Sequence, residues 1–256
     1  MRDIELIAHR GASHDAPENT LASFRLAWET GADGIEGDFR LTRDGEIICI
    51  HDPTTGRTAG ADLPVAGSTL ARLRELDAGA WKGEAWSRER IPTLREVIAT
   101  VPSGKRLFIE LKCGPEILSP LAAVLARSGL NPEQAVILAF NAEVVAASRE
   151  LLPRVKTLWL SDFRKERTFG GWSPSVEKIL LTLKSCGACG LAGSAHRSID
   201  AAFVRTLHDA GMEFHVWTVD APRSAARFVD IGADAIFTNR PGWLRGRLQA
   251  MAESGL

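Results

Sequence analysis

Short apolar runs alternate along the chain with longer segments in which apolar residues recur every three or four positions. Runs of the first kind are typical of buried strands, and the longer period is typical of amphipathic helices. The predicted strands are Ile4–Ala8, a run that begins near Asp33, Arg106–Lys112, Ala135–Ala139, Val155–Leu160, Ala188–Leu191, Glu213–Thr218 and Ala235–Thr238. The predicted helices are Leu21–Thr30, Leu94–Val101, Glu116–Ser128, Ala142–Leu152, Ser175–Lys184, Asp200–Ala210, Ala221–Ile231 and a terminal helix from Pro241.

The alternation comprises eight strand-then-helix units in 256 residues. Consecutive strands joined by helices need right-handed crossovers and form a parallel sheet. Eight such units in about 250 residues match a (β/α)8 TIM barrel in count and size, so we predict the α/β class with this architecture. A doubly wound open sheet is the second interpretation, although no glycine-rich phosphate loop follows the first strand.

The second predicted strand carries two acidic residues with a spacing of two. Because side chains two apart on a strand share a face, Glu36 and Asp38 point the same way. A turn at 43–45, with a glycine suited to positive φ, leads into the apolar run 47–50, which ends at His51. This hairpin-like excursion brings two carboxylates and an imidazole to one neighbourhood.

The segment between Pro53 and about Pro92 differs from the rest of the chain. Gly, Thr, Asp, Pro and Arg dominate it, and few apolar periods are visible. Long loops of this kind within a compact domain are usually functional. We therefore expect one domain over residues 1–256, with 53–92 as an insertion or cap after the second strand. A second irregular stretch is predicted around 168–173.

Composition narrows the classes of partner. The chain is 45% hydrophobic with a formal net charge of −1, which suits a full core and gives no electrostatic reason to expect nucleic acid or an acidic membrane. No apolar run approaches the roughly 20 residues that span a bilayer, and the N-terminus does not resemble a signal peptide. We expect a cytoplasmic protein without membrane insertion, and the sequence leaves its oligomeric state open. The pair Cys186 and Cys189 has the spacing of a redox or zinc motif, but small residues there favour packing.

Ionisable residues gather at the ends of the first three predicted strands. The first strand ends at His9 and Arg10, the second carries the acidic pair, and the third ends at Glu110 and Lys112. Such side chains are rarely buried unless they are paired or bind a metal. In a barrel, chemistry takes place at the carboxyl ends of the strands. Together with His51, these residues place two histidines, three carboxylates and two cations on one rim.

Three carboxylates without thiolate or clustered imidazole ligands suit one hard divalent cation, Mg²⁺ or Ca²⁺. We predict Glu36, Asp38 and Glu110 as its ligands. The competing interpretation is a salt-bridge cluster closed by Arg10 and Lys112. Beside a metal, these two cations would instead neutralise a phosphate.

Two histidines at strand ends beside such a cluster indicate proton transfer, because the ordinary pKa of histidine lies close to neutrality. We therefore predict that His9 and His51 are catalytic. The remaining histidines occur singly and are assigned surface or capping roles: His14, His196, His208 and His215.

Several motifs resemble the glycerophosphodiester phosphodiesterases: I-A-H-R-G, P-E-N-T, E-G-D-F-R-L-T-R-D-G, I-H-D, I-P-T-L-R-E-V and I-E-L-K. The resemblance runs from His9 to Pro241. It implies a (β/α)8 barrel with an insertion after the second strand. It also implies hydrolysis of a small-molecule phosphodiester, such as glycerophosphocholine or glycerophosphoethanolamine, to glycerol 3-phosphate and the free alcohol.

The resemblance also implies roles for individual residues. The family's metal-binding carboxylates fall on Glu36, Asp38 and Glu110, its acid–base pair on His9 and His51, and its phosphate-contacting cations on Arg10 and Lys112. Trp217 resembles the family's aromatic wall beside the substrate. Two departures exist: a glycine, Gly37, follows Glu36, and Thr238-Asn239-Arg240-Pro241 stands where the family often has T-D-x-P.

Other functions remain consistent with these residues. One is a metal-dependent phosphodiesterase that acts on lysophospholipids or on a phosphoinositol head group. Another is a barrel that binds phosphodiesters without hydrolysing them, although neither histidine and none of the carboxylates is missing. For the hydrolase, attack by the glycerol 2-hydroxyl to give a cyclic phosphate and direct attack by water both fit.

Overall fold

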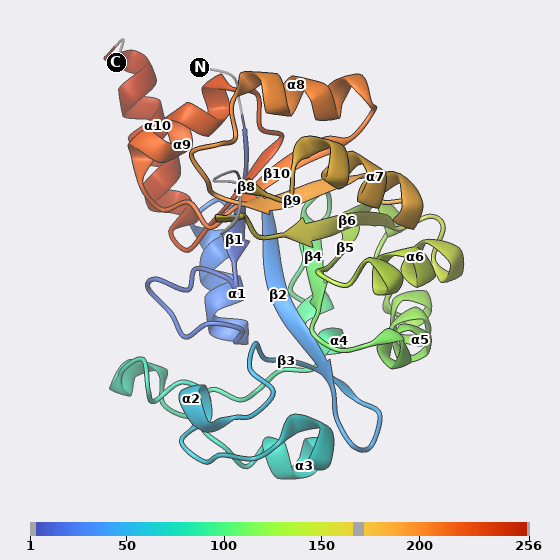
Figure 1. Ribbon diagram of the computed structural model, residues 1–256. Coiled ribbons are helices and arrows are strands. Elements are labelled where there is room, and N and C mark those ends of the chain that lie inside the picture. Colours follow the sequence, from blue (N-terminus) through green and yellow to red (C-terminus); the bar gives the residue numbers. More distant parts are fainter. Residues whose placement is uncertain (1–3, 166–171, 255–256) are drawn as a thin grey trace.

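The computed structural model describes residues 4–165 and 172–254, and within them eight parallel strands close into a barrel surrounded by helices (Figure 1). The first strand pairs with both the second and the last, which closes the sheet on itself. The barrel strands are β1 (Glu5–His9), β2 (Gly34–Leu41), β4 (Arg106–Leu111), β5 (Ala135–Ala139), β6 (Lys156–Ser161), β9 (Gly190–Ser194), β10 (Glu213–Trp217) and β11 (Ala235–Thr238). The predicted (β/α)8 TIM barrel is confirmed, and the open sheet is excluded.

Helices lie outside the barrel and begin where the sequence supplies capping side chains. Thr20 and Thr93 each form a capping box with the third residue of their helix, which satisfies exposed backbone N–H groups. The helices are α1 (Leu21–Glu29), α4 (Leu94–Ile98), α5 (Leu118–Ser128), α6 (Ala142–Leu151), α7 (Val176–Cys186), α8 (Ala201–Asp209), α9 (Pro222–Asp230) and α10 (Pro241–Glu253). All lie within a few residues of their predicted bounds; a 3₁₀ turn at Pro115–Ile117 delays the start of α5.

The interior of the barrel is filled in tiers by side chains from alternate strands, as the two-residue period of a strand requires. The tier nearest the amino ends of the strands is charged and comprises Glu5, Arg106, Lys156 and Glu213. The middle tier comprises Ile7, Phe108, Leu158 and His215. The upper tier comprises His9, Glu110, Leu160 and Trp217, which line one cavity. The carboxyl ends of the strands therefore carry the residues predicted for chemistry, above a middle tier in which three of the four side chains are apolar.

His215 corrects one prediction, because it is neither a surface nor a capping residue. Its side chain is 1% exposed and lies in the middle tier, with its ring 5.9 Å from that of Phe108. Its Nε2 donates a hydrogen bond of 3.0 Å to Glu213 Oε2, and Glu213 in turn pairs with Lys156. The prediction failed because it ignored the strand period, which places residues 213, 215 and 217 on one face.

The segment 53–92 packs beside the carboxyl end of β2 (Figure 1). It contains the short helices α2 (Gly56–Ala59) and α3 (Leu70–Leu73) and 3₁₀ turns at Val65–Gly67 and Glu84–Trp86. The predicted hairpin precedes it: β3 (Ile47–Cys49) pairs antiparallel with β2 after a turn in which Gly45 has φ +82°. A small apolar core of its own joins the segment to β3 and comprises Ile48, Ile50, Val65, Leu73, Ala78 and Ile91.

Two further observations complete the fold. The irregular stretch predicted around 168–173 falls mostly outside the described residues; its last two residues form β8 (Trp172–Ser173), which pairs with β7 (Arg164–Lys165). Among the described residues, every helix is too short or too polar to cross a bilayer.

Candidate active site

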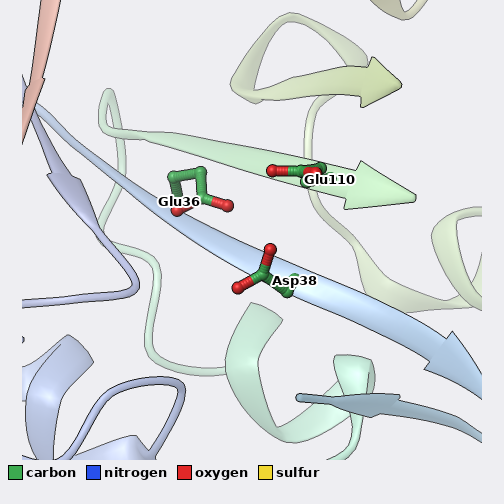
Figure 2. A group of neighbouring side chains, drawn as sticks. All are labelled: Glu36, Asp38 and Glu110. Atoms are coloured by element: carbon green, nitrogen blue, oxygen red, sulfur yellow. The ribbon is translucent and has the colours of Figure 1, made fainter. Parts of the chain in front are cut away.

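Three carboxylates from two neighbouring strands converge at the upper end of the barrel. Glu36 and Asp38 lie on β2, and Glu110 lies on β4 directly opposite Asp38 in the parallel register (Figure 2). One oxygen from each lies within 4.8 Å of the others. Their exposed fractions are 1%, 0% and 7%. The spacing of two on β2 thus places the pair as predicted, and strand pairing supplies the third member.

Crowding and burial shift the pKa values of these groups. Two ionised carboxylates about 5 Å apart repel by about 3 kcal/mol at an effective dielectric constant of about 20. Burial, together with Asp38 and Glu110, raises the pKa of Glu36 well above its ordinary value. Burial and Asp38 raise the pKa of Glu110 to about 7. Burial also acts to raise the pKa of Asp38, but Lys112 and Arg10 outweigh it and lower that pKa.

The cations around the trio do not satisfy all of its oxygens. Arg10 Nε lies 3.2 Å from Asp38 Oδ2, and Lys112 Nζ lies 3.1 Å from Asp38 Oδ1 and 2.5 Å from Glu110 Oε1. Both Lys112 contacts are ion pairs. Glu36 Oε1 is buried without a hydrogen-bond donor among the described residues, and Lys112 is the one cation within ion-pair distance of Asp38 Oδ1 and Glu110 Oε1 there.

The unpaired Glu36 Oε1 favours a metal site over a closed salt-bridge cluster. A closed salt-bridge cluster would pair each buried carboxylate oxygen, since an unpaired one costs about 1–3 kcal/mol or more. Here Glu36 receives only the backbone N–H of Arg10, at 2.9 Å on its other oxygen. Three converging carboxylate oxygens are the donor set that Mg²⁺ or Ca²⁺ takes. The residues present therefore fit a divalent cation.

Asn19, from the P-E-N-T motif, forms hydrogen bonds with Asp38 on β2. Its side chain donates to Asp38 Oδ2 at 2.8 Å and accepts from the Asp38 backbone N–H at 3.1 Å. The residue is 4% exposed and has φ +58°, which asparagine tolerates better than most residues. Asn19 thereby fixes the orientation of the central carboxylate.

The two predicted histidines line the same cavity of about 140 Å³ as Glu36, Glu110 and both cations. Each uses its Nδ1 to contact a neighbouring side chain. His9 Nδ1 lies 2.8 Å from Asn239 Oδ1, and His51 Nδ1 lies 2.7 Å from Asp52 Oδ1. His9 is partly open to the cavity, yet desolvation of its ring, with Arg10, lowers its pKa.

Aromatic side chains form one wall of the cavity. Trp217 is anchored by a 2.9 Å hydrogen bond from its Nε1 to the Ala192 carbonyl. Phe140, which the sequence analysis missed, packs edge-on against it with ring centres 5.7 Å apart. Lys112 Nζ lies 5.8 Å from the centre of the Phe140 ring. Phe140 follows β5 directly and is 46% exposed, which is unusual for so large an apolar side chain and marks a place where ligand carbon atoms can pack.

Arg40 and Arg57 form hydrogen bonds with residues next to the carboxylates and the histidines. Arg40 donates to the carbonyls of His51 and Lys112 at 2.9 Å each. Its position was predictable, since it follows Glu36 and Asp38 in the same two-residue period. Arg57, in the segment 53–92, donates to Asp52 and Glu18. Nothing in the sequence pattern indicated that Arg57 contacts Asp52 and Glu18.

The two cysteines of the C-x-x-C spacing are free thiols. Cys186 ends α7 and is buried against the outer core, while Cys189 precedes β9 and packs on the barrel interior. The packing interpretation fits these positions.

Comparison with known proteins identifies the family. Residues 9–243 match the Glycerophosphoryl diester phosphodiesterase family. The chain belongs to this family.

Individual relatives agree over almost the whole length. The chain is 33% identical over 242 residues to the Bacillus subtilis protein YhdW. The alignment covers 93% of this chain and 96% of YhdW. It is 32% identical over 241 residues to a glycerophosphodiester phosphodiesterase of Caldanaerobacter subterraneus subsp. tengcongensis, covering 92% and 94% of the two chains. A solved phosphodiesterase of Oleispira antarctica, in complex with the product sn-glycerol-3-phosphate, superposes with a TM-score of 0.85 at 28% identity and 96% coverage of each chain.

Membership of this family makes the chain an enzyme that cleaves glycerophosphodiesters. The resemblance carried by the sequence motifs is confirmed, and so is the barrel it implied. The structure adds a cluster of three acidic residues able to hold a metal ion.

Proposed function

We propose that the chain catalyses the metal-dependent hydrolysis of glycerophosphodiesters such as glycerophosphocholine and glycerophosphoethanolamine. The products are sn-glycerol 3-phosphate and the free alcohol. One observation carries the proposal: three buried carboxylates converge, Glu36 Oε1 has no hydrogen-bond donor among the described residues, and Glu36 and Glu110 line one cavity with two histidines and two cations. The Oleispira antarctica phosphodiesterase, solved with the product sn-glycerol-3-phosphate, supports the choice of product.

Glu36, Asp38 and Glu110 are the proposed ligands of one divalent cation, Mg²⁺ or Ca²⁺. When bound, such a cation polarises the phosphoryl group and offsets the negative charge that develops on it. Arg10 and Lys112 hold the remaining phosphate charge. Burial disfavours the charge on Lys112, but Asp38 and Glu110 outweigh it and raise its pKa, so it stays cationic at neutral pH.

His9 and His51 are the proposed acid–base pair, with His9 as base and His51 as acid in the first step. Each ring uses Nδ1 for a neighbouring side chain, which leaves Nε2 for the proton that moves. In attack by the glycerol 2-hydroxyl, one histidine deprotonates the hydroxyl and the other protonates the leaving alkoxide. Their roles then exchange when water opens the cyclic phosphate. Direct attack by water uses the same two groups.

Trp217 and Phe140 are proposed to pack against the carbon atoms of the substrate. The cavity, at about 140 Å³, suits a small head group. An acyl chain would need a continuous apolar groove, and the apolar lining described here consists of Leu138, Leu160, Phe237 and the aromatic wall. This lining favours glycerophosphodiesters over lysophospholipids.

The test measures glycerol 3-phosphate released from glycerophosphocholine with Mg²⁺, with Ca²⁺ and with EDTA. We expect activity that EDTA abolishes and that the cation restores. His9→Ala and His51→Ala should each lower kcat/KM by about 10²- to 10⁴-fold. His208→Ala, at an exposed histidine of α8 paired with Asp234, is the matched control and should retain activity. Inactivity on a panel of glycerophosphodiesters with Mg²⁺, Ca²⁺ and Mn²⁺, with hydrolysis of lysophospholipids or phosphoinositides instead, would contradict the proposal. Binding without turnover would indicate the non-catalytic barrel.

A further inference from the structure

A chain of hydrogen bonds from two loops ends on the ring of His9. Asp220 follows β10, and Asn239 follows β11. Asp220 Oδ2 accepts from Asn239 Nδ2 at 2.7 Å, and Asp220 Oδ1 accepts from the Asn239 backbone N–H at 2.7 Å and from the Thr238 hydroxyl at 2.8 Å. Asn239 Oδ1 lies 2.8 Å from His9 Nδ1. Neither Asp220 nor Asn239 was predicted as part of the site.

The chemistry of these groups allows only one arrangement of protons. An ionised carboxylate accepts hydrogen bonds and donates none, so Asp220 requires the NH₂ side of the Asn239 amide. The amide oxygen must then face His9, and because it only accepts, His9 Nδ1 must carry a proton. Ser13 Oγ also lies 2.8 Å from this oxygen and 2.7 Å from the His9 carbonyl, and its single proton serves these two acceptors.

The other ring nitrogen of His9 is left free for chemistry. Among residues 4–165 and 172–254, His9 makes its side-chain hydrogen bond through Nδ1 alone, and its ring lines the cavity. In a neutral imidazole that is protonated at Nδ1, Nε2 carries the lone pair. A base for the attacking hydroxyl needs that lone pair.

We propose that Asp220 and Asn239 are positioning residues that hold His9 in the Nδ1–H tautomer, with Nε2 unprotonated toward the substrate. The inference rests on the proposed function in one respect, the role of His9 as base. It also accounts for the departure at Thr238-Asn239-Arg240-Pro241. With Asp220 in place, a carboxylate at position 239 would face a second carboxylate at hydrogen-bond distance, whereas the amide transmits the orientation without a charge.

Exchange of the Asp220 and Asn239 side chains tests the direction of these hydrogen bonds. In Asp220→Asn the new amide donates to position 239, so Asn239 turns its oxygen toward it and presents NH₂ to His9. His9 is then forced into the Nε2–H tautomer. In Asn239→Asp two carboxylates face each other. In the double variant D220N/N239D, the amide introduced at position 220 donates to the carboxylate introduced at position 239. That carboxylate accepts from His9 Nδ1, as the native amide does. The double variant is therefore predicted to restore the native tautomer.

Two readouts are measured on the full chain with Mg²⁺. The first is the ¹⁵N spectrum of histidine-labelled protein, with the His9 signals assigned by their loss in His9→Ala. The second is kcat/KM for glycerophosphocholine. We expect the Nδ1–H pattern in the native chain and the Nε2–H pattern in D220N. We also expect kcat/KM in D220N to fall by about tenfold or more, with recovery to within about threefold of native in the double variant. Asp209→Asn, the same substitution at an exposed position at the end of α8, is the control and should change neither readout.

Retention of the Nδ1–H tautomer in D220N overturns the proposal, whatever the activity. A double variant no more active than D220N also overturns it. The spectrum does not depend on turnover, so a native chain that fails to hydrolyse glycerophosphodiesters refutes the proposed function and leaves the tautomer test intact.

Discussion

Binding of a divalent cation by the carboxylate trio should release protons and weaken steeply as the pH falls. The cation takes the ionised carboxylates, whereas burial and mutual repulsion raise the pKa of Glu36 and of Glu110 in the metal-free protein. Binding must therefore displace protons that an ordinary exposed glutamate would already have lost. The perturbation is a change of pH from 8 to 5.

The size of the effect follows from the pKa of Glu110, about 7. For one group with this pKa, the apparent Kd rises about a hundredfold between pH 8 and pH 5, because one proton competes with the cation throughout the lower part of that range. The raised pKa of Glu36 acts in the same direction. A glutamate with an ordinary pKa near 4.3 would change the Kd by less than about twofold over the same range.

The assay is isothermal titration calorimetry of chelator-treated protein with Mg²⁺ or Ca²⁺ at pH 5, 6 and 8. Two buffers with different heats of ionisation give the number of protons released. We expect release of about one proton or more at pH 6. Glu110→Gln removes one titrating carboxylate and leaves both imidazoles. It therefore distinguishes protons released by the carboxylates from protons released by His9 and His51. An apparent Kd that changes by less than about threefold, with no proton release, would refute the electrostatic account of the site.

Thermal melts provide a second measurement of the same linkage. Without the cation, the folded state binds more protons than the unfolded state between the ordinary glutamate pKa and about 7. Stability is therefore lost as the pH rises through this window, by about 4 kcal/mol for Glu110 alone. A bound cation removes this loss, so the gain in Tm from Mg²⁺ should be larger at pH 8 than at pH 5.

Three further substitutions test other parts of the structure. Arg57→Met should lower kcat/KM by about tenfold, because Arg57 donates a hydrogen bond to Asp52, the partner of His51. The Tm should change little, because the Arg57 side chain is 44% exposed. Arg72→Met, at an exposed arginine paired with Glu75, is the control. The hydrogen bond from His215 outweighs burial and, together with Lys156, lowers the pKa of Glu213 to about 2. The stabilisation that Glu213 contributes is therefore present above the ordinary glutamate pKa and is lost as the pH falls toward 2. Urea denaturation at pH 5 and pH 3 should therefore show a smaller loss of stability in Glu213→Gln than in the native chain, by at most about 2 kcal/mol, since the side chain is 35% exposed; an equal loss in both would contradict this. Gly37→Ala should destabilise the fold by about 1–3 kcal/mol in urea titrations, because the added Cβ would lie 2.9 Å from Cys49 Sγ and 3.1 Å from Phe24 Cζ; unchanged stability would show that the neighbours yield.

The barrel and the convergence of the three carboxylates were predictable because both follow from periods along the chain. Eight apolar runs separated by helical patterns admit few topologies. The spacing of two puts Glu36 and Asp38 on one face whatever the rest of the chain does. Glu110 follows once its strand lies beside theirs, and the barrel requires that neighbour. The same two-residue period also predicts that Arg40 lies on the face of Glu36 and Asp38, and that His215 lies on the interior face of its strand.

The residues that position the histidines were not predictable, because they lie in loops. Asp220 and Arg57 reach their partners only through the paths of the segments after β10 and β3, and no local pattern sets those paths. Phe140 belongs to the same class, since an apolar residue after a strand is ordinarily part of the core. The charged lower tier was missed for a related reason. Glu213 on β10 and Lys156 on β6 are paired across β9, which lies between their strands, and no local pattern reveals that strand order.

This division between strands and loops has a consequence for the chemistry. The proposed metal ligands come from β2 and β4, where register fixes them against small changes elsewhere. The proposed acid and base each depend on one contact from a loop, Asp52 for His51 and Asn239 for His9. Substitutions at these loop partners should therefore impair proton transfer while cation binding persists, whereas substitutions at the trio should abolish both. If Asp220→Asn lost the cation together with activity, the two halves of the site would be one cooperative unit, and the separation argued from strand register would be wrong.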